Sequence, residues 1–248
     1  MEESATTGEL IASLVYMIAG ARLVRLSCVT RETPERLLGA SFLLMGMGSL
    51  LYSLAVFPIL EASWTLLNFS ARISYVFAFI LVAIFTQRIF RPDERWGQWI
   101  VHGTVLLLIG GVGGSALSGD WEGFSIGSGW FWLEWMGYAA PVTWTCAEAT
   151  LEHTQARRRL RIGLCEPLVC NRLLLWAAFA ALQLCANLVS VGQYAAFEQE
   201  GVFTAGWDYL YSAVSISSLV MMWIAFFPPA LYKRWIEGVP HLHCSEKG

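Results

Sequence analysis

The sequence predicts an all-α fold, a single domain (residues 1–248) in which seven transmembrane helices form a bundle with the N-terminus outside and the C-terminus in the cytoplasm. Three observations lead to this prediction. The composition is apolar, because 56% of the residues are hydrophobic, 14% are charged and the mean hydropathy is +0.53. Seven apolar stretches each approach the ~20 residues that a helix needs to cross ~30 Å of hydrocarbon. The basic residues alternate from one connection to the next.

The predicted spans follow one another closely and use up most of the chain. They cover approximately residues 9–26, 36–57, 64–89, 96–117, 130–151, 173–194 and 207–232, and residues 233–248 form a cytoplasmic tail. No connection is long enough for a soluble domain. The acidic start, MEESATTGEL, lacks the basic region and the cleavage site of a secretory signal, so we expect the first span to remain as an anchor.

The basic residues determine the predicted orientation. Every lysine and arginine except Arg72 lies near the connections after the first, third, fifth and seventh spans, whereas the other connections carry aspartate and glutamate. Under the positive-inside rule the basic connections are cytoplasmic, so we expect a multi-pass protein of the bacterial inner membrane. Because orientation explains these basic residues, the expected partners are membrane lipids and not nucleic acid.

Membrane insertion and helix packing explain the first two spans. The first ends in Arg22 and Arg25, whose long stems can reach the cytoplasmic headgroups. The second contains Gly39, Gly46 and Gly48, small residues that let helices approach closely. This composition favours packing over contact with a ligand.

The third span carries polar residues on one face, where hydrocarbon cannot satisfy them. Asn68, Arg72 and Tyr75 fall at helical spacing. At 1.5 Å per residue, Arg72 lies about 12 Å inside Trp64 and needs a partner. Near the inner end, Arg88 could meet Glu148 of the fifth span in a closing ion pair. The alternative is an arginine that contacts lipid headgroups.

The remaining spans place further polar residues inside the membrane. The fourth begins with Trp96 and Trp99, which are typical of a membrane boundary. The fifth has Pro141, expected to kink it, between two buried acids. One-sided polar sets occur in the last three spans: Glu134, Tyr138, Thr145 and Glu148; Gln183, Asn187, Ser190 and Tyr194; and Asp208, Ser212, Ser215 and Ser218.

These polar faces predict an outward-facing cavity with a ligand-binding site in the outer half of the bundle. Arg72 paired with Glu134 or Asp208 could bind a ligand carboxylate, a phosphate or a lipid headgroup. The alternative is a structural salt bridge that fixes the packing of the helices. The predicted ligand-binding residues are Asn68, Arg72, Tyr75, Trp132, Glu134, Tyr138, Asn187, Asp208 and Ser212.

The chemistry of common membrane enzymes and photoreceptors is not recognisable. A retinal protein needs a lysine in the middle of its last span, and the lysines are Lys233 and Lys247, so retinal is excluded and no cofactor is expected. The sequence shows no metalloprotease, lipase or phosphate-loop motif, and no metal site is predicted. Glu134, Glu148 or His153 could act as an acid or a base, but no catalytic residue is predicted because no paired nucleophile accompanies them.

Three segments, TQRIFRPDERW, RRRLRIGLCEPLVCNRLLLW and WIAFFPPALYKRW, resemble a family of uncharacterised bacterial seven-helix membrane proteins. This resemblance covers most of the chain in outline and implies the fold and a cell envelope location, without an activity. A weaker architectural resemblance is to rhodopsin-like G-protein-coupled receptors. Pro229 to Tyr232 stand where those receptors have Asn-Pro-x-x-Tyr, Arg88 stands near their Asp-Arg-Tyr position, and residues 233–238 could form their eighth helix. Pro228 replaces the asparagine, so function does not follow from this resemblance.

We therefore expect a receptor-like sensor that binds a small or lipid-like ligand and signals through a separate cytoplasmic protein partner. Ligand binding would bias the kink at Pro141, and Arg88, Glu148 and Tyr232 would form the cytoplasmic switch. A transporter or lipid-handling protein is the first alternative, which requires a continuous polar path from Asp208 to Glu148. A non-catalytic membrane scaffold is the second.

Overall fold

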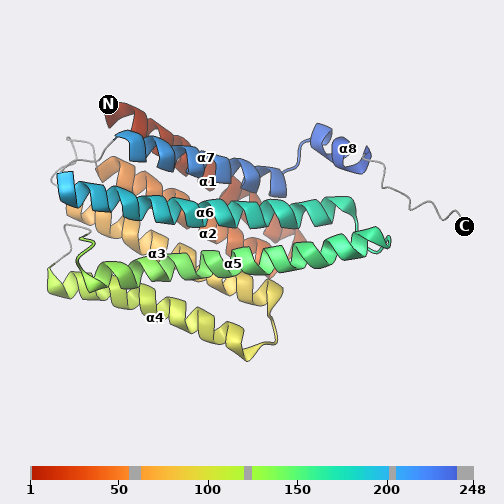
Figure 1. The fold of residues 1–248 in the computed structure, drawn as a ribbon, viewed down its shortest axis with the longest axis horizontal. Helices are drawn as coiled ribbons and strands as arrows, with labels where there is room; N and C mark the ends of the chain where they lie inside the picture. The colour runs from red at the N-terminus through yellow and green to blue at the C-terminus, as the bar shows by residue number, and fades with distance from the viewer. Residues whose placement is uncertain (1, 56–62, 120–124, 201–204, 239–248) are drawn as a thin grey trace, which may run out of the picture.

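A computed structural model shows an all-α bundle and describes residues 2–55, 63–119, 125–200 and 205–238 (Figure 1). The described residues form seven long helices and a short eighth. The long helices run side by side, and the short helix lies beyond the end of the seventh (Figure 1). The helices of the described residues are α1 (Glu2–Thr30), α2 (Thr33–Ala55), α3 (Trp64–Phe90), α4 (Arg95–Ser118), α5 (Gly129–Arg161), α6 (Pro167–Glu200), α7 (Ala205–Phe226) and α8 (Ala230–Gly238).

Six of these helices are long and apolar enough to cross a membrane, which indicates a multi-pass integral membrane protein. They are α1, α2, α3, α4, α6 and α7. The predicted fifth span, residues 130–151, is helical within α5. Helix α5 is long enough to cross a membrane but is less apolar than these six helices. Its glutamates, tryptophans and tyrosine lower the hydropathy of the helix although Glu134 and Glu148 are buried.

The last predicted span, residues 207–232, is wrong at its inner end. Helix α7 ends at Phe226 and α8 begins at Ala230, because Pro228 and Pro229 cannot donate the backbone hydrogen bonds that would continue the helix. Tyr232 therefore belongs to α8, where its hydroxyl accepts a hydrogen bond from Asn171 of α6. Two exposed apolar residues, Leu231 and Trp235, lie on α8 beside exposed Lys233 and Arg234.

The two ends of the bundle differ in charge. The connections α1–α2, α3–α4 and α5–α6 meet at the end that carries α8, and the described lysines and arginines other than Arg72 lie towards it. We call this the basic end. The opposite end, called here the acidic end, carries the start of α1 together with Glu198 and Asp208.

Glycines bring neighbouring helices together within two groups, which we call the first half (α1 to α3) and the second half (α4 to α7). In the first half, a Cβ atom added to Gly20 would lie 2.7 Å from the carbonyl oxygen of Gly39. In the second half, a Cβ added to Gly111 would lie 2.6 Å from the backbone nitrogen of Glu134, and Gly192 packs against Trp207. Among the described glycines, those that leave less than 3.4 Å for a Cβ contact a helix of their own half.

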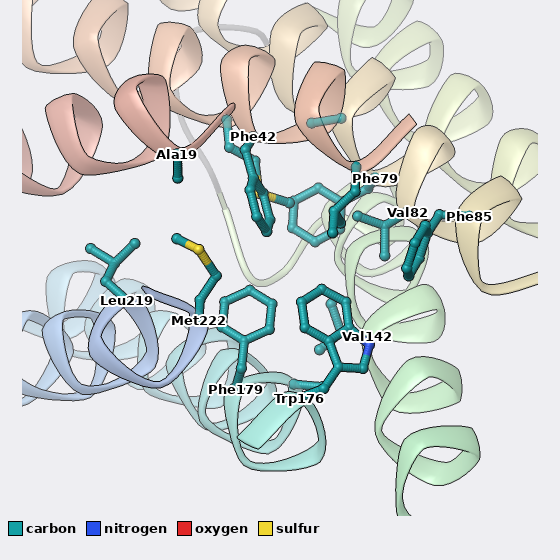
Figure 2. Packing of buried hydrophobic residues seen from close by; sticks show 14 of the residues in the cluster. Ala19, Phe42, Phe79, Val82, Phe85, Val142, Trp176, Phe179, Leu219 and Met222 are labelled. Atoms are coloured by element: carbon teal, nitrogen blue, oxygen red, sulfur yellow. The ribbon is translucent and has the colours of Figure 1, made fainter. Parts of the chain in front are cut away.

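The two halves meet along a seam where α3 packs against α5 and α1 packs against α7, while α4 lies outside against α3 and α5. Large side chains from both halves fill this seam. Figure 2 shows Phe42 and Phe79 of the first half opposite Trp176, Phe179 and Met222 of the second. Phe42, Phe79, Trp176 and Phe179 are among the residues that line a cavity of about 20 Å³, which is room for one water molecule.

Candidate functional site

A buried ion pair joins the halves towards the acidic end. Arg72 of α3 donates hydrogen bonds from Nε and Nη2 to the two carboxylate oxygens of Glu134 on α5, the first over 3.4 Å. The hydroxyl of Tyr138 donates to Glu134 Oε1 over 2.7 Å. We call Arg72, Glu134 and Tyr138 the Arg72 cluster. One of the two pairings expected for Arg72 is therefore present, and Asp208 is not its described partner.

The local packing explains why this ion pair is stable in an apolar bundle. Gly111 and Gly137 bring α4 and α5 into backbone contact at the level of Glu134, and Arg72 and Glu134 are both more than nine-tenths buried. Charges are tolerated at such a site when they are paired and hydrogen-bonded in good geometry. Both oxygens of Glu134 have donors, so the Arg72 cluster is internally satisfied.

Asn68 lies one helical turn from Arg72, and its side chain is not satisfied by the described residues. The side chain is 6% exposed, and its Oδ1 has no hydrogen-bond partner in the described part of the chain. A buried acceptor without a donor costs free energy, about 1–3 kcal/mol. Asn68 is therefore the member of the predicted ligand set whose chemistry favours binding of a further group.

A second ion pair joins the same two helices near the basic end. Arg91, just after α3, donates from Nε to Oε1 of Glu148 on α5 over 2.9 Å, and Trp144 Nε1 donates to the same oxygen over 3.2 Å. The Arg91 guanidinium also lies over the ring of Trp96, 5.4 Å from its centre. We call Arg91, Trp144 and Glu148 the Glu148 cluster.

The predicted pairing of Arg88 with Glu148 is wrong. Arg88 is exposed, whereas Arg91 reaches the carboxylate. Arg91 lies where the chain leaves the helix, with φ −140° and ψ 54°, so its direction is not set by the helical repeat. The hydrogen bond from Arg91 to Glu148, and then the charge of that carboxylate, raise the pKa of Arg91, so this guanidinium remains charged.

An apolar layer separates the two clusters. On α3, Phe79 and Val82 lie between Arg72 and the basic end, and Val142 lies between the two glutamates of α5. All three are buried in the seam. The polar contact nearest this layer joins the hydroxyls of Thr86 and Thr145 over 2.6 Å. The direct line along α3 and α5 from the Arg72 cluster to the Glu148 cluster therefore passes through apolar side chains.

The other predicted site residues lie apart from the Arg72 cluster or make contacts of their own. Gln193 donates to Asp208 over 2.8 Å, between α6 and α7. Asn187 donates to the carbonyl oxygen of Gln183 within α6. Trp132 donates to the carbonyl oxygen of Ile126. Tyr75 packs beside Gly48 of α2, and Ser212 is half-buried on α7. None of the nine predicted ligand-binding residues lines the cavity in the seam.

Sequence reasoning did not identify two contacts across the seam. At the α1–α6 contact, Gln183 donates to the hydroxyl of Tyr16 over 2.7 Å and to Ser218 over 2.8 Å. The other is the Glu148 cluster. Trp144 and Glu148 are four residues apart on α5, and this spacing could have indicated their contact. No sequence pattern indicates that Tyr16 faces α6.

No family model, curated protein or solved structure matches this chain. The two clusters, the seam and the packing of the halves are therefore the features that bear on its function.

Tyr138→Phe should lower the free energy of unfolding by about 1.5–3 kcal/mol, because a hydrogen bond to a buried carboxylate is lost. Chemical denaturation in detergent, followed by circular dichroism, measures this change. Tyr209→Phe is the matched control, since Tyr209 is exposed on α7 and its hydroxyl contributes no described hydrogen bond. Equal stability of the two variants would contradict the assigned role of Tyr138.

Proposed function

We propose that this chain is a seven-span, receptor-like membrane sensor in which a ligand at the outer end of the seam changes the relative position of the two halves. The unsatisfied oxygen of Asn68 beside the Arg72 cluster is the observation that carries the proposal. The basic end lies in the cytoplasm, as the positive-inside rule requires. A separate cytoplasmic protein receives the signal.

The packing of α5 supports a seventh span. This helix has 33 residues, which extend about 50 Å at 1.5 Å per residue. It packs between α4 and α6, both of which can cross a membrane. A helix in this position crosses the membrane with its neighbours. Its two glutamates are tolerated there because Arg72 of α3 and Arg91, just after α3, form ion pairs with them.

The kinds of contact in the bundle support movement at the seam. Glycines bring α1 close to α2 and α2 close to α3 in the first half, and α4 close to α5 and α6 close to α7 in the second. Close-packed interfaces of this kind deform little. Across the seam, the ion pairs, the threonine pair and the Tyr16 contact join side chain to side chain. Such contacts can break and re-form by rotamer changes while each half keeps its backbone packing.

The chemistry of Asn68 indicates the class of ligand. An amide oxygen accepts hydrogen bonds, so the ligand presents a hydroxyl, an amide N–H or an ammonium group. The surrounding bundle is apolar, and the rest of the ligand is therefore small or lipid-like. The Arg72 cluster positions α3 against α5 and supports the site without offering its own carboxylate, whose oxygens both have donors.

Two alternatives fit the seam less well. A transporter of polar solutes needs a polar route, whereas Phe79, Val82 and Val142 are apolar side chains buried between the two clusters of α3 and α5. A scaffold accounts for the satisfied Arg72 cluster but not for the buried oxygen of Asn68 without a donor. The scaffold predicts that no molecule is retained at this position.

Native mass spectrometry of the protein released from mild detergent tests the ligand site. Wild type should retain a defined small molecule or lipid, and Asn68→Leu should lose it without a fall in the unfolding midpoint, because the substitution breaks no described bond of Oδ1 and removes a buried acceptor without a donor. Leu66→Ala on the same helix, a side chain that is mostly exposed, is the control and should retain the molecule. Bare wild-type protein, or equal retention by Asn68→Leu, would overturn the proposal.

A further inference from the structure

The two buried glutamates of α5 differ in how well they are satisfied. Glu134 receives donors on both oxygens, from Arg72 and Tyr138. Glu148 receives both of its donors on Oε1, while Oε2 has no partner among the described residues although the side chain is nine-tenths buried or more. A carboxylate oxygen that is buried and unpaired is costly. The ion pair at Glu148 is therefore a weaker contact between the halves than the ion pair at Glu134.

We propose that Glu148 Oε2 is a proton-binding site and that proton uptake from the cytoplasm opens the basic end of the seam. The inference rests on the proposed movement of the halves. The proton adds to Oε2 and converts the carboxylate to a neutral carboxylic acid. No other covalent bond forms or breaks. The ion pair with Arg91 is then replaced by a weaker hydrogen bond to a neutral group.

The surroundings of Glu148 favour a proton over a larger cation. A sodium or calcium ion needs several oxygen ligands, and no group of three or more carboxylate, histidine or cysteine ligands occurs in the described residues. Trp144 and Arg91 are donors that would repel a metal ion. A proton needs no space beyond the oxygen itself.

The charged groups around Glu148 determine which partner can change state. The segment that follows α3 contributes Arg91 and Glu94, and α5 itself contributes Glu152, which lies near Arg91. From α4, Trp96 covers the guanidinium. On the α6 side, His153 of α5 bonds to the carbonyl oxygen of Cys170. Arg91 keeps its charge, so the proposed proton goes to the carboxylate and not to the guanidinium.

Release of Arg91 would separate α3 from α5 at one end. Arg91 is 34% exposed in its side chain, so it can turn towards cytoplasmic water without leaving an unpaired charge in the bundle. The Arg72 cluster remains closed at the other end, because both oxygens of Glu134 keep their donors. The halves would then pivot about the acidic end.

Infrared difference spectroscopy in nanodiscs of phosphatidylcholine tests the proton site, with the pH lowered stepwise from neutral. A carboxylic acid carbonyl band should grow as the pH falls, disappear in Glu148→Gln, and persist in the matched variant Glu166→Gln, which removes an exposed carboxylate at the same end of the bundle. Arg91→Gln should show the same band at higher pH, because the positive charge that opposes protonation is gone. An unchanged band in Glu148→Gln would overturn the proposal.

Spin–spin distances test the opening. Labels carried by unnatural amino acids at Ile89 and Leu151, exposed positions on α3 and α5 near the basic end, leave the cysteines intact. Wild type should show a longer distance at acidic pH, and Glu148→Gln the longer distance throughout the pH range. A proton band without a distance change would refute the opening. Ligand retention at Asn68 is measured independently, so failure of the ligand site and failure of the proton site are distinguishable.

Discussion

Arg72→Leu should lower the free energy of unfolding by about 3–5 kcal/mol, because Glu134 would keep a buried charge after its partner is removed. Arg72 and Glu134 are nearly inaccessible to solvent, so water cannot replace the lost guanidinium. Glu134 retains the hydroxyl of Tyr138, which does not compensate for a full charge. Equilibrium unfolding in detergent micelles at neutral pH provides the measurement.

A double-mutant cycle separates the ion pair from the rest of the arginine side chain. The variant with Arg72→Leu and Glu134→Leu should recover most of the lost stability, since an apolar pair of similar volume replaces a buried ion pair at little cost. If Arg72→Leu alone unfolds like wild type, the ion pair does not hold the halves together. If the double variant is as unstable as the single one, side-chain packing rather than charge accounts for the loss.

Gly20→Ala should destabilise the first half by about 1–3 kcal/mol, the range for inserting a methyl group into a well-packed interface. The new Cβ would lie 2.7 Å from both the carbonyl oxygen of Gly39 and the backbone nitrogen of Leu43. These are backbone atoms, so α1 and α2 would have to separate. Thermal unfolding followed by circular dichroism would show a lower midpoint.

Gly103→Ala is the control for this prediction. An added Cβ at Gly103 meets nothing within 4 Å, and alanine stabilises a helix interior by up to about 1 kcal/mol over glycine. The two substitutions are chemically identical and should change stability in opposite directions. Equal effects would show that helix propensity, and not close approach, determines the contribution of Gly20.

The sequence was sufficient to predict the helices and one ion pair. Seven apolar stretches correspond to seven long helices, because both length and hydropathy are local properties of the chain. Arg72 and Glu134 were one of two predicted pairings, the other being Arg72 with Asp208, because each charge lies inside a span where it needs an opposite charge. Their contact is present in the structure, while their relation to a ligand remains a prediction.

The remainder depended on information that a single sequence does not contain. Arg88 and Arg91 are equally plausible partners for Glu148 by position, and the choice was decided by the backbone after the end of α3. The hydropathy of α5 also did not show whether this helix lies inside the bundle or faces lipid. The seam is formed by aromatic residues that resemble those of any helix face, so its position appears only when the helices are assembled.

The sequence separation of Arg72 and Glu134 has a consequence for biosynthesis. The two residues are 62 positions apart, so at 5–20 residues per second the ribosome needs about 3–12 s after making Arg72 to produce its partner. Through this interval α3 must carry a lone cation into the bilayer, at a cost of about 2.5–3.5 kcal/mol on insertion scales. Helix α3 is the most apolar of the six candidate spans. Its leucines, isoleucines, valines and phenylalanines allow the translocon to release it before the acid that neutralises it exists.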